Sequence, residues 1–258
     1  MISRFRHPAV FWGAFFAFSA SLFFIFQLRE TTQVAYVAPE PKPKEERAAH
    51  ISTPEPVRAI YMTSWVAGTK GWRENLARFI DATELNAVVI DVKDYTGRLS
   101  FPVDDPEIQK TLAASEPVVP DIREFVEYLH SKNIYAIARI SVFQDPWFVS
   151  QRPEYAVKTK SGAVWKDKKG LTWVDPAARD FWDYIVSVAL ETERAGFDEL
   201  NFDYVRFPSD GNMRDIAYDH WDGVRPQAEV IRDFFAYMRR ALDERLSTPR
   251  KIRSDLVY

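Results

Sequence analysis

The chain has 258 residues, of which 47% are hydrophobic, 15% aromatic and 28% charged, and its formal net charge is −3. It contains no cysteine, which excludes disulfide scaffolds, cysteine-ligated zinc, iron–sulfur clusters and thiol nucleophiles. The near-balanced charge argues against nucleic-acid binding through phosphate neutralisation, and the apolar content is sufficient for a core. We therefore expect a folded protein that has no nucleic-acid partner.

Residues 1–29 are predicted to form a short cytoplasmic stub and a transmembrane signal anchor. An uncharged apolar run extends from Ala9 to Leu28, after Arg4 and Arg6. Twenty helical residues span about 30 Å, the thickness of the hydrocarbon core of a bilayer. A cleaved signal peptide is the alternative, but its apolar region usually has only about 7–15 residues. Because the basic residues come first, we expect a single-pass bacterial cell-membrane protein whose partner is the lipid bilayer and whose C-terminal domain is extracytoplasmic.

Residues 30–56 have the composition of an extended linker. They contain five prolines among charged residues, and this composition favours solvated chain over packing. The folded domain is therefore expected over residues 57–258.

Within residues 57–258, short apolar runs alternate with amphipathic segments. The apolar runs predict strands at residues 57–62, 87–93, 134–140 and 199–203, and a fifth strand that begins at 251–257. The amphipathic segments predict helices at residues 72–84, 121–132, 176–195 and 226–246. Asp121 is expected to cap the second of these helices. Strands that are separated by helices imply a parallel sheet.

Two α/β architectures fit this order, an open doubly wound sheet and a TIM (β/α)8 barrel. The glycine-rich phosphate loops of open-sheet nucleotide-binding proteins are absent from the sequence. Charged residues instead follow several strands, where barrel enzymes place their catalytic groups. We therefore predict a barrel. A whole barrel takes about 250 residues, so four to five βα units imply a chain that is incomplete at its C-terminus. The charged residues at the strand ends are Asp91, Lys93, Asp94, Arg139, Asp203 and Arg206.

Asp203 is the strongest candidate for a functional residue. It alternates with Asn201 on a strand, so both side chains are expected to point into the barrel. A charge at the end of an apolar strand costs several kcal/mol unless it is paired or solvated in a cleft. Two interpretations remain open: an ion pair between Asp203 and Arg206 that holds the loop, or a carboxylate in a substrate-binding cleft.

Four segments together resemble the bacterial putative glycosyl hydrolase domain family, which is grouped with (β/α)8-barrel glycoside hydrolases. They are residues 88–94 (VVIDVKD), 137–145 (IARISVFQD), 173–176 (WVDP) and 196–208 (GFDELNFDYVRFP). The resemblance extends from Val57 to the C-terminus. It implies hydrolysis of O-glycosyl bonds in a polysaccharide or oligosaccharide. At Tyr95 the family usually has a further acidic residue, and its domain continues through later strands.

The fourth-strand segment is also similar to the chitinase-type barrel signature. Aligning that signature with residues 197–204 places its last aspartate on Asp203 and its catalytic glutamate on Val205. Valine cannot donate a proton, so the substrate-assisted chemistry of chitinases is not expected.

Glycoside hydrolysis generally uses two carboxyl groups, one protonated and one ionised. Asp203 is predicted to be the ionised group, with Arg206 or Arg139 lowering its pKa. Asp91 or Asp94 is predicted to supply the second carboxyl group, unless that group lies on a later strand. A structural alternative stays open for some of these residues. Asp91 could form an ion pair with Lys93, and Arg139 could be the partner of either aspartate.

Aromatic side chains gather in the long segments that follow the third and fourth strands. Their rings can stack on sugars, although any single tryptophan could equally pack within a loop. The segment 141–172 is too long for a simple connection and is predicted to be a binding lid. The predicted substrate-binding residues are Lys93, Arg139, Tyr204, Arg206, Trp65, Trp147 and Trp173.

The four histidines, at positions 7, 50, 130 and 220, show no ligand spacing, so no metal or other cofactor is expected. His130 is expected at the surface. The sequence thus predicts a glycoside hydrolase that acts on a cell-envelope or extracellular polysaccharide through a pair of strand-end aspartates. The alternatives are a non-catalytic glycan-binding module and an envelope scaffold on the same barrel.

Overall fold

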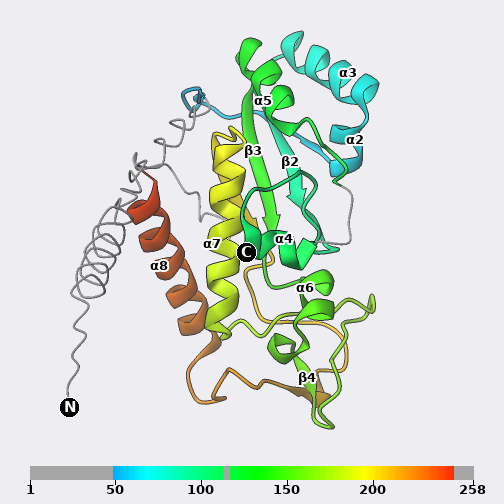
Figure 1. Ribbon diagram of the computed structural model, residues 1–258, viewed down its shortest axis with the longest axis vertical. Helices are drawn as coiled ribbons and strands as arrows, with labels where there is room; N and C mark the ends of the chain where they lie inside the picture. Colours follow the sequence, from blue (N-terminus) through cyan, green and yellow to red (C-terminus); the bar gives the residue numbers. More distant parts are fainter. Residues whose placement is uncertain (1–48, 113–116, 247–258) are drawn as a thin grey trace, which may run out of the picture. The chain divides into compact units, whose positions relative to one another are not determined.

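The computed structural model describes residues 49–112 and 117–246 (Figure 1). The predicted membrane anchor, most of the predicted linker and the predicted fifth strand at 251–257 lie outside these ranges. Among the residues described, no helix combines the length and apolar character needed to cross a bilayer. The anchor therefore stays a prediction from the sequence.

Four parallel strands form the main sheet of the described chain, in the order β1-β2-β3-β5. The predicted parallel α/β arrangement is thus confirmed, and each strand lies close to its predicted position. The strands are β1 (Ala59–Met62), β2 (Ala87–Lys93), β3 (Tyr135–Ser141) and β5 (Glu199–Asp203).

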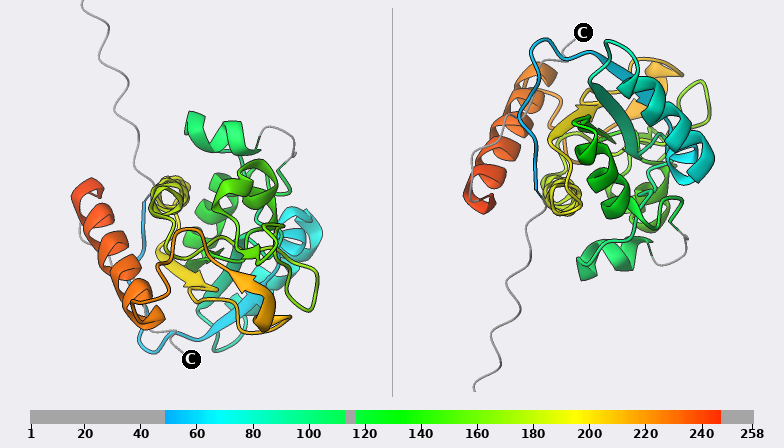
Figure 2. Two further views of the ribbon diagram at one scale, coloured as in Figure 1. Left: turned by 90° about the horizontal axis from the view of Figure 1, so that it is seen from below. Right: turned by 90° about the horizontal axis from the view of Figure 1, so that it is seen from above.

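Four longer helices correspond to the four predicted ones, and α7 is seen end-on beside α8 in Figure 2. They are α3 (Lys70–Asp81), α5 (Ile122–Ser131), α7 (Arg179–Arg194) and α8 (Gln227–Arg245). The connections also contain short helices that the sequence pattern does not predict. These are α2 (Ser64–Gly68), α4 (Pro106–Leu112), α6 (Pro146–Gln151) and the 3-10 helices η1 (Pro153–Tyr155) and η2 (Met213–Asp215).

Asp121 precedes α5 as predicted, but its side chain makes no capping hydrogen bond. Its Oδ1 instead accepts a hydrogen bond of 2.7 Å from Nη1 of Arg73 on α3, and its Oδ2 accepts one from Nη2. A buried arginine competes with the helix N-terminus for this carboxylate, so the residue links two helices.

The two faces of the main sheet differ in chemistry because side chains alternate along each strand. One face packs against α3, α5, α7 and α8 through a buried apolar cluster that includes Val88, Ile90, Ala138, Ile140 and Phe202. The opposite face begins with a small apolar cluster formed by Ala87, Tyr135 and Ile137. It ends in charged side chains at the carboxyl edge of the sheet, as the sequence pattern predicts.

A bulge interrupts this alternation in β2. Asp91 is paired with Arg139 on β3, but Lys93 is paired with Ile140, so one extra residue lies between them. A bulge re-aims the side chain that follows it. The predicted alternative of an Asp91–Lys93 ion pair is therefore wrong. Lys93 Nζ lies 2.8 Å from Asp145 Oδ2, with both side chains 0% exposed.

The segment predicted to be a lid contains α6, η1 and the short strand β4 (Lys158–Thr159). β4 pairs antiparallel with β6 (Ile216–Ala217), which lies in the segment after β5. The buried ring of Trp165 adds a second link, because its Nε1 donates a 3.1 Å hydrogen bond to Asn212 O. The connections after β3 and β5 are thus joined in one ordered layer, and opening of this layer as a lid stays a prediction.

The amino edge of the sheet is closed around Asp198, whose side chain is 1% exposed. Its Oδ2 lies 2.9 Å from His130 Nε2 and accepts a 2.9 Å hydrogen bond from Ala136 N. Ile51 N donates to Oδ1 at 2.9 Å. His130 has only 10% of its side chain exposed, so its predicted surface position is wrong. The cause is the buried carboxylate of Asp198, which draws the histidine inward.

Candidate active site

Arg139 on β3 joins an aspartate on each neighbouring strand. Its Nη1 donates to Asp91 Oδ1 at 2.7 Å, and its Nε and Nη2 donate to Asp203 Oδ2 at 2.9 and 2.6 Å. The register of the sheet brings the three residues together, since Asp91 pairs with Arg139 and Asp203 pairs with Ser141. Arg139 is predicted to pair with either aspartate, and in the structure it pairs with both. The alternative of an ion pair between Asp203 and Arg206 is wrong, because Arg139 is the partner of Asp203.

The charge of Arg139 is what allows two carboxylates to share this edge. Burial is the largest influence on the pKa of Arg139 and acts to lower it. Hydrogen bonds and attraction from Asp91 and Asp203 outweigh burial and raise the pKa above its ordinary value. Arg139 therefore remains cationic and offsets the repulsion between the two aspartates.

Tyr61 on β1 completes the environment of Asp91 by donating its hydroxyl to Asp91 Oδ2. Burial, followed by the hydrogen bond to Asp91 and its negative charge, raises the pKa of Tyr61 to about 12. Both carboxylate oxygens of Asp91 are thus occupied, and its side chain is 6% exposed. Asp203 is 41% exposed and is the more accessible carboxylate of the pair.

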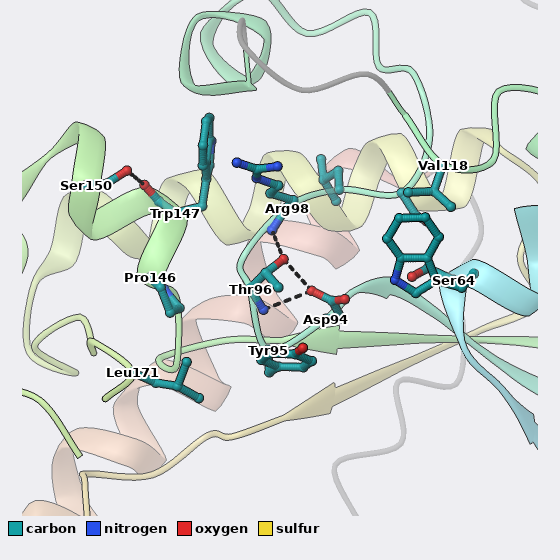
Figure 3. Close-up of a pocket in the computed structure, with 13 residues that line it drawn as sticks. Ser64, Asp94, Tyr95, Thr96, Arg98, Val118, Pro146, Trp147, Ser150 and Leu171 are labelled. Carbon is teal, nitrogen blue, oxygen red and sulfur yellow. Dashed lines mark hydrogen bonds between the residues drawn. The ribbon is translucent and has the colours of Figure 1, made fainter. Parts of the chain in front are cut away.

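Asp94 lies just beyond β2, in a turn that its own side chain stabilises. Its Oδ1 accepts hydrogen bonds from Thr96 N at 2.8 Å and Thr96 Oγ1 at 2.6 Å (Figure 3). Oδ2 of Asp94 makes no hydrogen bond to any residue in the described ranges. One oxygen of Asp94 therefore fixes the carboxyl group while the other is available.

Two neighbouring clefts open at the carboxyl edge of the sheet. The first, which we call the Arg139 cleft, has a volume of about 460 Å³ and is lined by Tyr61, Asp91, Arg139, Gln144, Lys169 and Tyr204 among others. The second, the Arg98 cleft, has a volume of about 560 Å³ and is lined by Arg98, Leu99, Val118, Pro146 and Trp147 among others (Figure 3). Both are lined by Ser64, Trp65, Asp94, Tyr95 and Leu171. The shared wall makes them one extended groove.

Several predicted substrate-binding residues do line this groove. Trp65 lies in the shared wall with 70% of its surface exposed. Trp147 lines the Arg98 cleft, and Tyr204 lines the Arg139 cleft. Tyr204 also has a positive φ of 55°, an uncommon conformation for a residue with a side chain. Such backbone conformations cluster at functional sites.

Other predicted substrate-binding residues do not line either cleft. Trp173 is 0% exposed, and its Nε1 donates a 3.0 Å hydrogen bond to Asp167 Oδ2. The guanidinium of Arg206 lies 4.8 Å from the centre of the Trp173 ring and donates to Phe207 O and Ser209 Oγ. Trp173 and the buried Lys93 present no surface to a ligand here. Both side chains are enclosed, which argues against the direct contact with substrate that the sequence predicts for them.

Several residues that line the groove are not predicted from the sequence patterns. Tyr61, Tyr95 and Arg98 follow or end strands of the sheet, so the strand-end rule that selected Asp91 could also have selected them. Gln144 and Lys169 come from the long segment after β3. No sequence signal assigns these two residues to the groove, because their positions depend on how that segment folds.

The described part of the chain contains no group of three or more His, Cys, Asp or Glu side chains arranged to hold a metal ion.

A family model described as "Putative glycosyl hydrolase domain" matches residues 59–248. Among solved structures, a hypothetical protein from Ruminiclostridium thermocellum ATCC 27405 is 32% identical, with a TM-score of 0.64. The match covers 70% of this chain and 91% of that protein. A comparison with curated proteins finds no match.

Two more distant solved structures are glycosidases. Alpha-L-fucosidase isoenzyme 2 from Paenibacillus thiaminolyticus is 14% identical, with a TM-score of 0.50 over 72% of this chain. A GH31 alpha-xylosidase from a soil metagenome, complexed with xylose, is 14% identical, with a TM-score of 0.53 over 79% of this chain. This chain spans about 30% of the length of each of them. At this identity the likeness shows the fold alone, an α/β fold with a parallel sheet that resembles part of barrel glycosidases.

Proposed function

This chain belongs to the putative glycosyl hydrolase domain family, and from that premise we propose that it hydrolyses glycosidic bonds in a cell-envelope or extracellular polysaccharide. One observation carries the proposal. Arg139 holds the carboxylates of Asp91 and Asp203 at the carboxyl edge of a parallel sheet, where Asp91, Asp94 and Arg139 line a groove. Barrel enzymes place their catalytic groups at this edge.

Asp203 is proposed as the ionised carboxylate of the reaction. It is the more exposed of the two aspartates on Arg139, and the hydrogen bonds from Arg139 stabilise its negative charge. Such a carboxylate can either attack the anomeric carbon or activate a water molecule. The fixed position of Arg139 orients Asp203 before substrate arrives.

Asp94 is proposed as the proton donor to the leaving oxygen. It lines both clefts, and its Oδ2 makes no hydrogen bond to described residues, whereas both oxygens of Asp91 are occupied by Arg139 and Tyr61. Asp91 is accordingly proposed as a positioning residue that fixes Arg139. The sequence predicts a catalytic pair of strand-end aspartates, and we propose that this pair is Asp203 and Asp94.

The aromatic residues that line the groove are proposed to bind the sugar rings. Trp65 and Tyr95 are 70% and 55% exposed in the wall shared by the two clefts. Exposed indole and phenol rings offer apolar faces on which sugars stack. The predicted anchor would place such a domain outside the cell, where envelope and exported polysaccharides lie.

The proposal is tested with the full chain in detergent and a panel of bacterial envelope and extracellular polysaccharides, by measuring the release of reducing ends. Asp203→Asn is expected to reduce hydrolysis at least about 100-fold while glycan binding persists. Asp94→Asn is expected to lose hydrolysis of polysaccharides but to retain hydrolysis of aryl glycosides, whose activated leaving groups need no acid. The matched control is Asp219→Asn, which changes an exposed aspartate.

Other outcomes would identify the alternatives. Hydrolysis by Asp203→Asn at the wild-type rate would contradict the proposal. Glycan binding by the wild type without any turnover would favour a glycan-binding module. Failure to bind any polysaccharide of the panel would leave the scaffold function.

A further inference from the structure

The Arg98 cleft contains a cationic group that the proposed reaction does not use. The Arg98 guanidinium lies 4.2 Å from the centre of the Trp147 ring, and Figure 3 shows the two side chains side by side. Arg98 is exposed, and it forms no ion pair with any carboxylate of the described residues. By contrast Arg152, which lies 4.9 Å from the centre of the Tyr155 ring, pairs with Glu154 at 2.6 Å.

The turn that carries Arg98 is fixed tightly to α6. Trp147 N donates a 3.0 Å hydrogen bond to Thr96 O. Gly97 has a φ of 84°, and a Cβ at this position would lie 1.8 Å from Asp145 Oδ1. That same oxygen caps α6 by accepting a 2.8 Å hydrogen bond from Phe148 N. The backbone on both sides of the Arg98–Trp147 contact is therefore held in place before any ligand binds.

We propose that the Arg98 cleft is a subsite for an acidic sugar residue, a uronic acid, in the same glycan chain that reaches the Arg139 cleft. This inference rests on the proposed glycosidase function. A guanidinium that stacks on an aromatic ring keeps its N–H donors free in the plane of the stack. Those donors match the two oxygens of a carboxylate and bind it bidentately. No protein carboxylate in the described ranges satisfies Arg98, so a ligand carboxylate is the complementary group.

The wall that the two clefts share gives a bound glycan a path from one cleft to the other. Trp65 and Tyr95 line both clefts with exposed rings, so a glycan can extend along them from Arg139 to Arg98. Asp94 lies in the same wall, where the proposed reaction uses it as the proton donor, and of the two clefts Arg98 lines only the Arg98 cleft. The acidic residue is therefore assigned to the Arg98 end of the groove.

The test measures binding, so that it does not depend on turnover. The probes are oligomers of galacturonic, glucuronic and mannuronic acid, each compared with its carboxyl-reduced neutral counterpart, by calorimetry on the full chain in detergent. The wild type is expected to bind at least one acidic oligomer about ten times more tightly than its neutral counterpart, because a charge-assisted bidentate pair contributes about that factor. Arg98→Gln is expected to abolish this preference, so that it binds the acidic oligomer and its neutral counterpart with similar affinity.

Two further variants make the result specific. Arg98→Lys retains the charge without the bidentate geometry and is expected to keep only part of the preference. Arg152→Gln removes the other exposed arginine described above and is expected to keep all of it. Equal affinity for every acidic and neutral pair, or a preference that survives Arg98→Gln, would overturn the inference.

The same measurements with Asp203→Asn separate this inference from the proposed function. If hydrolysis is unaffected by Asp203→Asn but the acidic preference depends on Arg98, the proposed catalytic role fails and the subsite stands. If hydrolysis depends on Asp203 but no acidic preference is seen, the subsite fails and the hydrolase stands.

Discussion

The two edges of the main sheet use aspartates in opposite ways. At the amino edge, Asp198 is 1% exposed, and two backbone N–H groups and His130 occupy its oxygens. At the carboxyl edge, Asp203 is held by Arg139, which lines the groove, but remains 41% exposed. The same residue type thus stabilises the fold where it is enclosed and is available for chemistry where it is open. The exposed fraction of the side chain, more than the presence of a charged partner, distinguishes the structural aspartate from the candidate catalytic one.

A third aspartate shows that a position near the carboxyl edge does not by itself identify a functional residue. Asp145 lies near the carboxyl edge but is 0% exposed, with Lys93 as its partner. Burial raises the pKa of Asp145, while the attraction of Lys93 acts against that rise. The pair supports α6 and the turn at Gly97, so it is structural although it lies close to the candidate site.

The largest expected effect comes from breaking this buried pair. Lys93→Met leaves the carboxyl group of Asp145 buried without its cation, which is expected to reduce the free energy of unfolding by about 3–5 kcal/mol. Urea denaturation measures the change. The matched control is Lys132→Met, which removes a partly exposed pair with Asp81 and is expected to cost much less, because solvent screens such a pair. Similar small losses for both variants would mean that the Lys93 pair is no more stabilising than a surface pair.

Gly97→Ala is expected to have the next largest effect. A Cβ would meet Asp145 Oδ1 at 1.8 Å, and the φ of 84° is strained for any other residue. The overpacking and the strain together are expected to cost about 2–4 kcal/mol. Gly162 has a similar φ of 87°, but no atom lies within 4 Å of a Cβ at that position. Gly162→Ala should therefore lose only the stability that the backbone strain costs, about 1 kcal/mol. Equal thermal denaturation of the two variants would contradict the close contact with Asp145.

At the amino edge of the sheet, we expect a smaller effect on the free energy of unfolding, and this effect depends on pH. Burial is the largest influence on the pKa of Asp198 and acts to raise it, but hydrogen bonds from His130, His50 and the backbone lower the pKa to about 2. Because the folded-state value lies below the unfolded one, the stabilisation is present above about pH 4 and is lost as pH falls towards 2. Asp198→Asn should therefore lower the free energy of unfolding at neutral pH by about 1–2 kcal/mol.

Denaturation between pH 2 and pH 7 checks this prediction. The wild type and Asp219→Asn should lose stability as the pH falls below 4, while Asp198→Asn should lose less over that range. An identical acid dependence in all three proteins would mean that Asp198 does not stabilise the fold through its charge.

Local sequence patterns predict the frame of the molecule better than its contacts. The apolar runs locate the four described strands, because a strand buried on both faces needs continuous apolar residues. The strand-end rule likewise selects Asp91, Arg139 and Asp203, which the parallel register then joins. Fold class and the core of the candidate site therefore follow from the sequence alone.

The contacts that the sequence does not predict each depend on tertiary structure. The bulge in β2 turns Lys93 away from Asp91, and no residue type marks its position. Trp173 is buried by the layer that joins the segments after β3 and β5, so its aromatic character does not indicate exposure. His130 is drawn to Asp198, which lies 68 positions away in the sequence.

The most direct test of the difference between the two edges compares Asp203→Asn with Asp198→Asn in two measurements, hydrolysis per folded molecule and free energy of unfolding. Asp203→Asn should lose hydrolysis at least about 100-fold with stability within about 1 kcal/mol of the wild type. Asp198→Asn should lose stability but keep the wild-type rate of hydrolysis per folded molecule. A folded Asp203→Asn protein that cleaves glycan at the wild-type rate would contradict the assignment of the carboxyl edge as the active site.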